Sequence, residues 1–221
     1  MKETQSLIIT IGRQFGSGGR GVAKILSEKY GIPLYDKELI NRVSHETGIC
    51  NEVFSTCDEC TNNYPNSSLL GGWSLSTLFS TTNRDMLSGD SLFAMQSETI
   101  RRIASEGPCV IVGRIADYVL RQHQPLVSVF ITSDDDDRIR RVAEYDMDDR
   151  VKRIMEYENI DAQQAANLIK KVDKMRSSYY NFYSEKTWGS ADSYQLCINT
   201  SKVGIEAAAQ LVMNYIDAVA R

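Results

Sequence analysis

The chain has 221 residues, of which 42% are hydrophobic and 24% charged, so it is long enough to bury a core as one medium domain. A formal net charge of −4 and a pI near 5.3 argue against a general nucleic-acid binder, which usually presents a basic face. No apolar run approaches the ~20 residues of a membrane span, and no signal peptide is visible before the first predicted strand. We therefore expect a cytoplasmic protein without membrane or nucleic-acid partners, and its oligomeric state stays open.

The first predicted elements are organised around a glycine-rich segment. A β-branched apolar run, Leu7–Ile11, predicts a strand, and helical periodicity runs from Arg20 to Tyr30 after a glycine-rich turn. Strand, glycine loop and helix in this order suit a phosphate-binding loop, because glycines let backbone N–H groups crowd around an anion and the helix N-terminus adds its positive dipole end. The residues expected to bind phosphate groups are Arg13, Gly16, Ser17, Gly18, Gly19, Arg20 and Gly21.

This loop departs from a regular Walker A motif. With Gly18 as the second glycine of the motif, Arg13 stands in the place of the first glycine and Gly19 in the place of the lysine. Arg20 comes one position after the place of the lysine, where the motif has Ser or Thr, and Gly21 follows it. The strict pattern is therefore not met.

Predicted strands and helices alternate along the rest of the chain. Further strands are predicted at 31–36, 108–114, 126–132 and 194–198, and helices at 38–47, 90–106, 116–121, 135 to about 158, 161 to about 182, and 204–220. Several of these strands are continuously apolar, which predicts an α/β fold with a five-stranded parallel sheet and helices on both faces. Ligands of such folds bind at the carboxyl ends of the strands. Those ends carry the glycine loop, Asp36, Arg114, Thr132, Ser133 and Asn199.

Residues 49–89 interrupt the alternation. Cys, Asn, Ser, Thr and Gly dominate this segment. A structureless loop of that length is uncommon inside a compact domain, so we expect a functional lid or a partly helical insert.

The five cysteines, Cys50, Cys57, Cys60, Cys109 and Cys197, are too few for a disulfide scaffold. A zinc site at the single CxxC pair would need a fourth ligand, for which His45 is the only near candidate, so reduced thiols are expected. Cys109 and Cys197 lie in apolar strand patterns and are expected to be buried.

Three stretches of the chain resemble parts of bacterial cytidylate kinases. The parts are the turn after the second strand of those kinases, the turn after their third strand, and their fourth strand with the arginine-bearing helix that follows it. In this chain the three stretches are Asp36–Arg42, Ile111–Arg114 with Ala116 and Asp117, and Phe130–Asp134 with Arg138, Arg140 and Arg141. The whole chain, except about 50–85, more closely resembles the divergent cytidylate kinase-like family. That resemblance rests on Arg13–Arg20, Tyr35–Leu39, and Trp188–Gly189 with Cys197–Thr200.

The resemblance implies one P-loop kinase domain over residues 1–221, of the three-layer P-loop NTPase fold, which transfers phosphate from ATP to a nucleoside monophosphate. CMP or dCMP is the first acceptor to test, and ATP and Mg²⁺ are the implied cofactors. No metal ligand is assigned, because no Ser/Thr occupies the loop's magnesium position; Mg²⁺ would be held by other groups or through waters. Arg20 would supply the charge of the missing lysine.

The remaining roles also follow from the resemblance. The insert at about 49–89 would bind the acceptor or act like a lid, and a lid is expected within about 145–185. The candidate catalytic arginines are Arg20, Arg150, Arg153 and Arg176. Arg42 and Arg114 would hold the acceptor phosphate, because guanidinium groups pair bidentately with phosphate oxygens. The acceptor-binding set is Asp36, Arg42, Arg114, Asp117 and Asp173.

Several alternatives stay open. The chain could be a nucleotide-binding regulator without kinase activity, because it lacks the Walker lysine and hydroxyl, or a kinase of another small metabolite. Asp134–Asp137 fits either a metal cluster or a solvated helix start, and we expect at least one arginine among Arg138, Arg140, Arg141, Arg150 and Arg153 to serve the site. The aromatic group Tyr179, Tyr180, Phe182, Tyr183 and Trp188 fits either core packing or stacking on a nucleobase.

Overall fold

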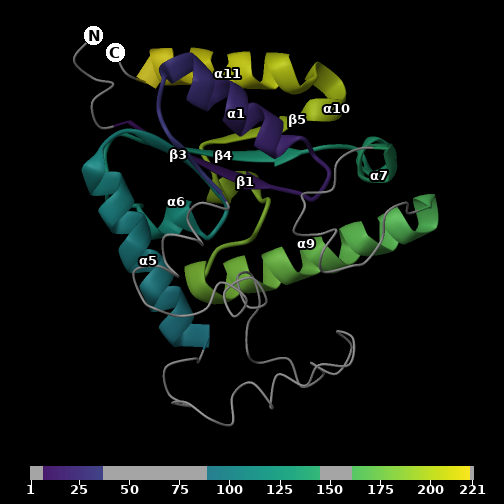
Figure 1. Ribbon diagram of the computed structural model, residues 1–221, viewed down its shortest axis with the longest axis horizontal. Helices are drawn as coiled ribbons and strands as arrows, with labels where there is room; N and C mark the ends of the chain where they lie inside the picture. The colour runs from purple at the N-terminus through teal and green to yellow at the C-terminus, as the bar shows by residue number, and fades with distance from the viewer. Residues whose placement is uncertain (1–6, 37–88, 145–160, 220–221) are drawn as a thin grey trace.

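A five-stranded sheet lies at the centre of the computed structural model, which describes residues 7–36, 89–144 and 161–219 (Figure 1). The strands are β1 (Ile8–Arg13), β2 (Leu34–Tyr35), β3 (Cys109–Val112), β4 (Leu126–Thr132) and β5 (Leu196–Asn199). Their order is β2-β3-β1-β4-β5, and every pairing is parallel. Because parallel strands all point the same way, their carboxyl ends, and the loops that follow them, meet at one edge.

Helices cover both faces of the sheet. They are α1 (Gly19–Tyr30), α5 (Gly89–Glu106), α6 (Ala116–Val119), α7 (Asp135–Glu144), α9 (Ala162–Ser184), α10 (Thr200–Val203) and α11 (Ile205–Val219), with a 3-10 turn at Ala191–Ser193. Figure 1 shows α1 and α11 on one face, and α5, α6 and α9 on the other. The predicted three-layer α/β fold with five parallel strands is confirmed. Among the helices in the described ranges, none combines the length and apolar character that crossing a membrane requires.

Strand β1 is apolar because both of its faces are buried. Ile9 and Ile11 pack with Val22 and Leu26 of α1, while Ile8, on the opposite face, joins the cluster formed by α5 and α6. All three isoleucines are fully buried. A central parallel strand buried on both faces carries such continuous apolar runs.

Helix α9 connects two smaller apolar clusters. Near its start it packs against α7 through Ala165 and Leu168, and near its end Tyr179 and Tyr180 join the aromatic cluster at Phe130. This long helix therefore runs past the edge of the sheet where the glycine loop lies (Figure 1).

Most predicted elements agree with the structure to within a few residues, and the bounds of β4 are the same. Helix α10 was not expected; it starts because the Asn199 side chain accepts a hydrogen bond from the Ser201 amide at 2.9 Å. The predicted helix 38–47, nearly all of the 49–89 insert, and positions 145–160 of the predicted lid lie outside the described residues.

The prediction that both strand cysteines are buried is correct for Cys109 and wrong for Cys197, which is exposed. Strand β5 is the last strand of the sheet order, and its Ile198 packs in the α1–α11 core. Because neighbouring strand residues point to opposite faces, Cys197 faces away from that core.

Candidate active site

The loop between β1 and α1 has a backbone that its glycines permit. Gly16 and Gly18 have φ values of 75° and 78°, in the left-handed region that favours glycine. A Cβ atom at Gly16 would lie 2.9 Å from the Arg138 carbonyl oxygen, so position 16 has no room for a side chain. Gly18 is the N-cap of α1 and provides no side-chain cap, which suits an N-terminus that binds an anion with its amides.

Helices α7 and α9 hold this loop at Phe15. The Phe15 amide donates to Asp173 Oδ1 at 2.8 Å, and its carbonyl accepts from Arg138 Nε at 2.9 Å. The Arg138 guanidinium is buried and also pairs with Asp173 and Asp135. Burial raises the pKa of Asp173, although the Phe15 amide and the Arg138 charge act in the opposite direction. The structure thus places Asp173, predicted to bind the acceptor, against the loop.

Arg141 of α7 and Thr200, which follows β5, hold the other side of the loop. Arg141 Nη1 donates to the Gly16 carbonyl at 3.3 Å, to Ser133 Oγ at 3.0 Å and to Thr200 Oγ1 at 3.2 Å. The Thr200 hydroxyl donates to the Ser17 carbonyl at 2.7 Å. Sequence reasoning did not assign a role to Thr200; its place directly after a strand in a polar run is the signal that would have found it.

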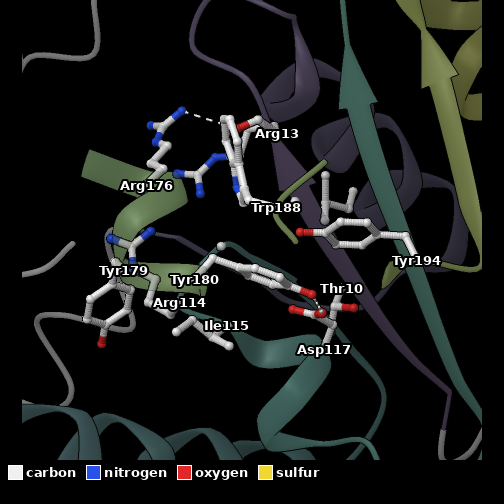
Figure 2. A pocket seen from close by; sticks show the side chains of 13 residues that line it. Thr10, Arg13, Arg114, Ile115, Asp117, Arg176, Tyr179, Tyr180, Trp188 and Tyr194 are labelled. Carbon is white, nitrogen blue, oxygen red and sulfur yellow. Dashed lines mark hydrogen bonds between the residues drawn. The ribbon is translucent and has the colours of Figure 1, made fainter. Parts of the chain in front are cut away.

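A pocket opens beside the loop, between the ends of β1 and β3, helix α9 and the segment after it. Figure 2 shows Arg114 and Arg176 toward one end of the pocket, and Asp117 and Tyr194 toward the other. The lining side chains include Thr10, Arg13, Arg114, Ile115, Asp117, Arg176, Tyr179, Tyr180, Trp188 and Tyr194. One end is therefore cationic, and the other is aromatic and polar.

Three arginines surround the buried carboxylate of Asp36. Arg114 Nη1 lies 2.8 Å from Asp36 Oδ1, and Arg13 Nη2 lies 3.8 Å from the same oxygen. Arg20 Nε lies 3.6 Å from Asp36 Oδ2. The ends of β1, β2 and β3 and the start of α1 thus bring together residues predicted separately for the phosphate and acceptor sites.

The turn that presents Arg114 is strained. Gly113, Arg114 and Ile115 have φ values of 77°, 57° and 55°, three left-handed residues in succession. A β-branched side chain such as that of Ile115 is a genuine outlier in this region, and such strain gathers at functional sites. The turn directs Arg114 Nη1 toward both Asp36 and the Val112 carbonyl, the latter at 3.1 Å.

Buried hydroxyl and carboxyl groups form the aromatic end of the pocket. The Tyr180 hydroxyl donates to Asp117 Oδ2 at 2.7 Å, and the Tyr194 ring stacks on Tyr180 with centroids 5.6 Å apart. Burial raises the pKa of Asp117 and also that of Tyr194. The Tyr194 hydroxyl is buried, and among the described residues no group pairs with it in acceptable hydrogen-bond geometry. Of the predicted aromatic group, Tyr179, Tyr180 and Trp188 both pack in the aromatic cluster and line the pocket. Tyr183 packs against that cluster without lining the pocket, and Phe182 is 52% exposed.

Two further candidate residues, Arg176 and Gly21, pack against neighbouring residues of the site. Arg176 Nη1 donates to the Arg13 carbonyl at 3.4 Å, and its guanidinium lies 5.6 Å from the centre of the Phe15 ring. A Cβ at Gly21 would meet Ile205 at 3.1 Å, so this position also has little space. The predicted Arg42, Arg150 and Arg153 lie outside the described residues.

The acidic run before and within α7 behaves as a solvated helix start. Asp134 is exposed and lies 2.5 Å from Lys202 Nζ, whose hydrogen bond lowers the pKa of that carboxyl. Asp137 pairs with Arg140 at 2.6 Å. Within residues 7–36, 89–144 and 161–219, no group of three or more acidic, histidine or cysteine side chains is arranged to hold a metal ion.

Comparisons with known proteins concern the family and the fold of the chain. The model of a family described as the cytidylate kinase-like family matches residues 8–146 and 144–202. An uncharacterized protein from Eubacterium ventriosum ATCC 27560, of solved structure, is 33% identical with a TM-score of 0.66, and the match covers 96% of this chain and 98% of that one. Shikimate kinase from Bacteroides thetaiotaomicron has the same fold, with 12% identity, a TM-score of 0.56 and the same two coverages. No curated protein matches the chain.

Proposed function

Since the chain belongs to the cytidylate kinase-like family, we propose that it transfers the terminal phosphoryl group of ATP to a nucleoside monophosphate, with CMP or dCMP the first acceptor to test. The fold is that of P-loop kinases. In the transfer, an acceptor oxygen forms a bond to the γ-phosphorus, the bond from that phosphorus to the β–γ bridging oxygen breaks, and ADP leaves.

The convergence of Arg13, Arg20 and Arg114 on Asp36, between the glycine loop and the pocket, carries this proposal. Phosphoryl transfer needs little covalent chemistry from the protein, and its catalysis is mostly positioning and charge stabilisation. Guanidinium groups suit that task because their planar forks match phosphate oxygens. A donor held by the loop and an acceptor held in the pocket would meet beside this cluster.

Each part of the site has a role in the proposal. The amides of the loop and of the first turn of α1 would hold the donor phosphates. Arg114 and Arg176 would hold the acceptor anion, and Tyr180 and Trp188 would contact its ring. Asp173 acts indirectly, through its contact with Phe15 of the loop. Mg²⁺ would arrive on the ATP phosphates, which suits a site whose described residues form no dedicated metal cage.

A second candidate is a kinase that phosphorylates another small anionic metabolite. The arginine end of the pocket favours it, because guanidinium groups bind a carboxylate as readily as a phosphate. The third possibility, a nucleotide-binding regulator, follows from the missing Walker lysine.

The test measures ADP release from ATP and Mg²⁺ with each nucleoside monophosphate in turn. We expect CMP-dependent turnover that Arg114→Ala reduces by about 10²-fold or more, because one anion contact in the transition state is lost. The matched control is Arg101→Ala, an arginine of α5 that is 56% exposed and pairs with Glu98. ATP binding without consumption of any nucleotide or small-metabolite acceptor would favour the regulator instead.

A further inference from the structure

Positions 13 and 19 exchange the two residue types that a Walker A motif places there. The motif has a glycine where this chain has Arg13, and a lysine where this chain has Gly19. We infer that Arg13 supplies the positive charge of the missing lysine, and that Gly19 is the reciprocal change that makes room for it. This inference rests on the proposed function and names a further residue that stabilises the transferred phosphoryl group.

The packing at Gly19 shows that the two positions share one space. A Cβ atom at Gly19 would lie 2.7 Å from Arg13 Cβ and 3.2 Å from Arg13 Cγ, and 3.3 Å from Ile131 Cβ. Real Cβ atoms do not approach that closely, and the atoms they would meet are the stem of Arg13, which is fixed to the backbone. A lysine at position 19 and an arginine at position 13 therefore exclude each other.

The direction of the Arg13 side chain supports the same assignment. The aliphatic part of the Arg13 side chain packs against Gly19. Its guanidinium lines the pocket, with Nη2 lying 3.8 Å from Oδ1 of Asp36. The side chain is 12% exposed, whereas that of Arg20 is 50% exposed. Figure 2 shows Arg13 among the side chains that line the pocket. On the proposed function, negative charge develops beside this pocket as the bond to the bridging oxygen breaks. The sequence alone favoured Arg20 for this task, which is the competing assignment.

The first experiment is a stability cycle without nucleotide, on wild type, Gly19→Lys, Arg13→Gly and the double variant that restores the motif. Gly19→Lys alone is expected to lower the melting temperature by several degrees, because overpacking forces the backbone to move. Adding Arg13→Gly removes the two closest contacts, so the double variant should recover most of that loss. A double variant as unstable as the sum of the two single changes contradicts the shared space.

The second experiment measures MgATP affinity by calorimetry and ADP release for the same proteins, with Arg13→Ala, Arg20→Ala and the control Arg101→Ala. Loss of Arg13 should reduce turnover by about 10²-fold or more, and the double variant should recover to within about tenfold of wild type. If Arg13→Ala retains turnover and ATP affinity while Arg20→Ala loses them, the charge belongs to Arg20 and the inference is wrong.

MgATP affinity and ADP release, measured on the same proteins, distinguish failure of this inference from failure of the proposed function. Wild type that binds MgATP and phosphorylates no acceptor contradicts the kinase. In that case the MgATP affinities still decide on Arg13, since its loss weakens binding only if its guanidinium contacts the phosphates.

Discussion

At the scale of single residues, the buried carboxyl group of Asp117 links stability to pH. Burial raises its pKa in the folded protein, against the hydrogen bond from Tyr180. An acid whose pKa is higher in the folded than in the unfolded state destabilises the fold as pH rises above the unfolded value of about 3.9. This loss of stability grows until the pH passes the pKa of Asp117 in the folded protein. Well below the pKa in the unfolded chain, the loss is absent.

Replacing Asp117 by asparagine removes that loss of stability and keeps an oxygen for the Tyr180 hydroxyl. Asp117→Asn should therefore melt at a higher temperature than wild type at pH 7.5, with the difference shrinking toward zero as the pH falls below about 4. Thermal unfolding over this pH series, with exposed Asp136→Asn as control, measures it. Equal melting temperatures at every pH would mean that the carboxyl ionises as readily in the folded chain as in the unfolded one.

Ile115 supplies a second prediction, because its backbone is left-handed at φ 55° while its side chain is 4% exposed. Truncating a buried isoleucine to alanine usually destabilises by about 2–5 kcal/mol. Ile115→Ala should cost about 1 kcal/mol less than Ile103→Ala, a fully packed helical position, because alanine relieves part of the β-branched strain. Urea unfolding of both variants gives the comparison, and equal costs would show that the turn stores no such strain.

At the scale of elements, helix α9 begins with a capping box. Asp161 Oδ1 accepts from the Gln164 amide at 2.7 Å, and Gln164 Oε1 accepts from the Asp161 amide at 2.9 Å. Asp161→Ala should destabilise the protein by about 1 kcal/mol, whereas Asp161→Ser should retain most of the stability. Because Asp161 lies twelve residues before Asp173 in the sequence, MgATP affinity should stay near the wild-type value unless the whole helix loosens. Melting curves and calorimetry on the same samples distinguish the two effects.

The elements themselves were the most predictable part of the molecule. Strand β4 was predicted residue for residue because a strand covered on both faces is a nearly continuous apolar run; only Ser128 and Thr132 of β4 are polar. Asp36 and Arg114 were expected to meet because both follow parallel strands, and they do, at 2.8 Å.

Contacts between elements were not predictable in the same way. Periodicity does not tell which of several polar residues on α9 reaches the loop, so the contact of Asp173 with Phe15 was missed. It also does not give the sheet order, so the exposure of Cys197 on the last strand was missed. From the sequence, Arg13 and Gly19 are two separate departures from the Walker A motif. The structure shows that they are linked, because a side chain at position 19 would overlap that of Arg13.

At the scale of the whole molecule, nucleotide binding should raise stability by mass action. MgATP at about 100 times its dissociation constant adds about 2.7 kcal/mol, which for a chain of this size raises the melting temperature by roughly 5–10 °C. Adenosine, which lacks the phosphates, should give a much smaller shift in the same assay. Equal shifts from MgATP and adenosine would show that the glycine loop and its arginines do not contribute to binding.

The double contact at Phe15 also makes this residue a natural probe of opening motions. Its amide proton is held by a carboxylate 158 residues away in the chain, and not by a neighbour in a strand or helix. Hydrogen–deuterium exchange at this single amide therefore reports how often α9 separates from the loop. The rate should fall when MgATP is added, even if the protection of the central strands does not change.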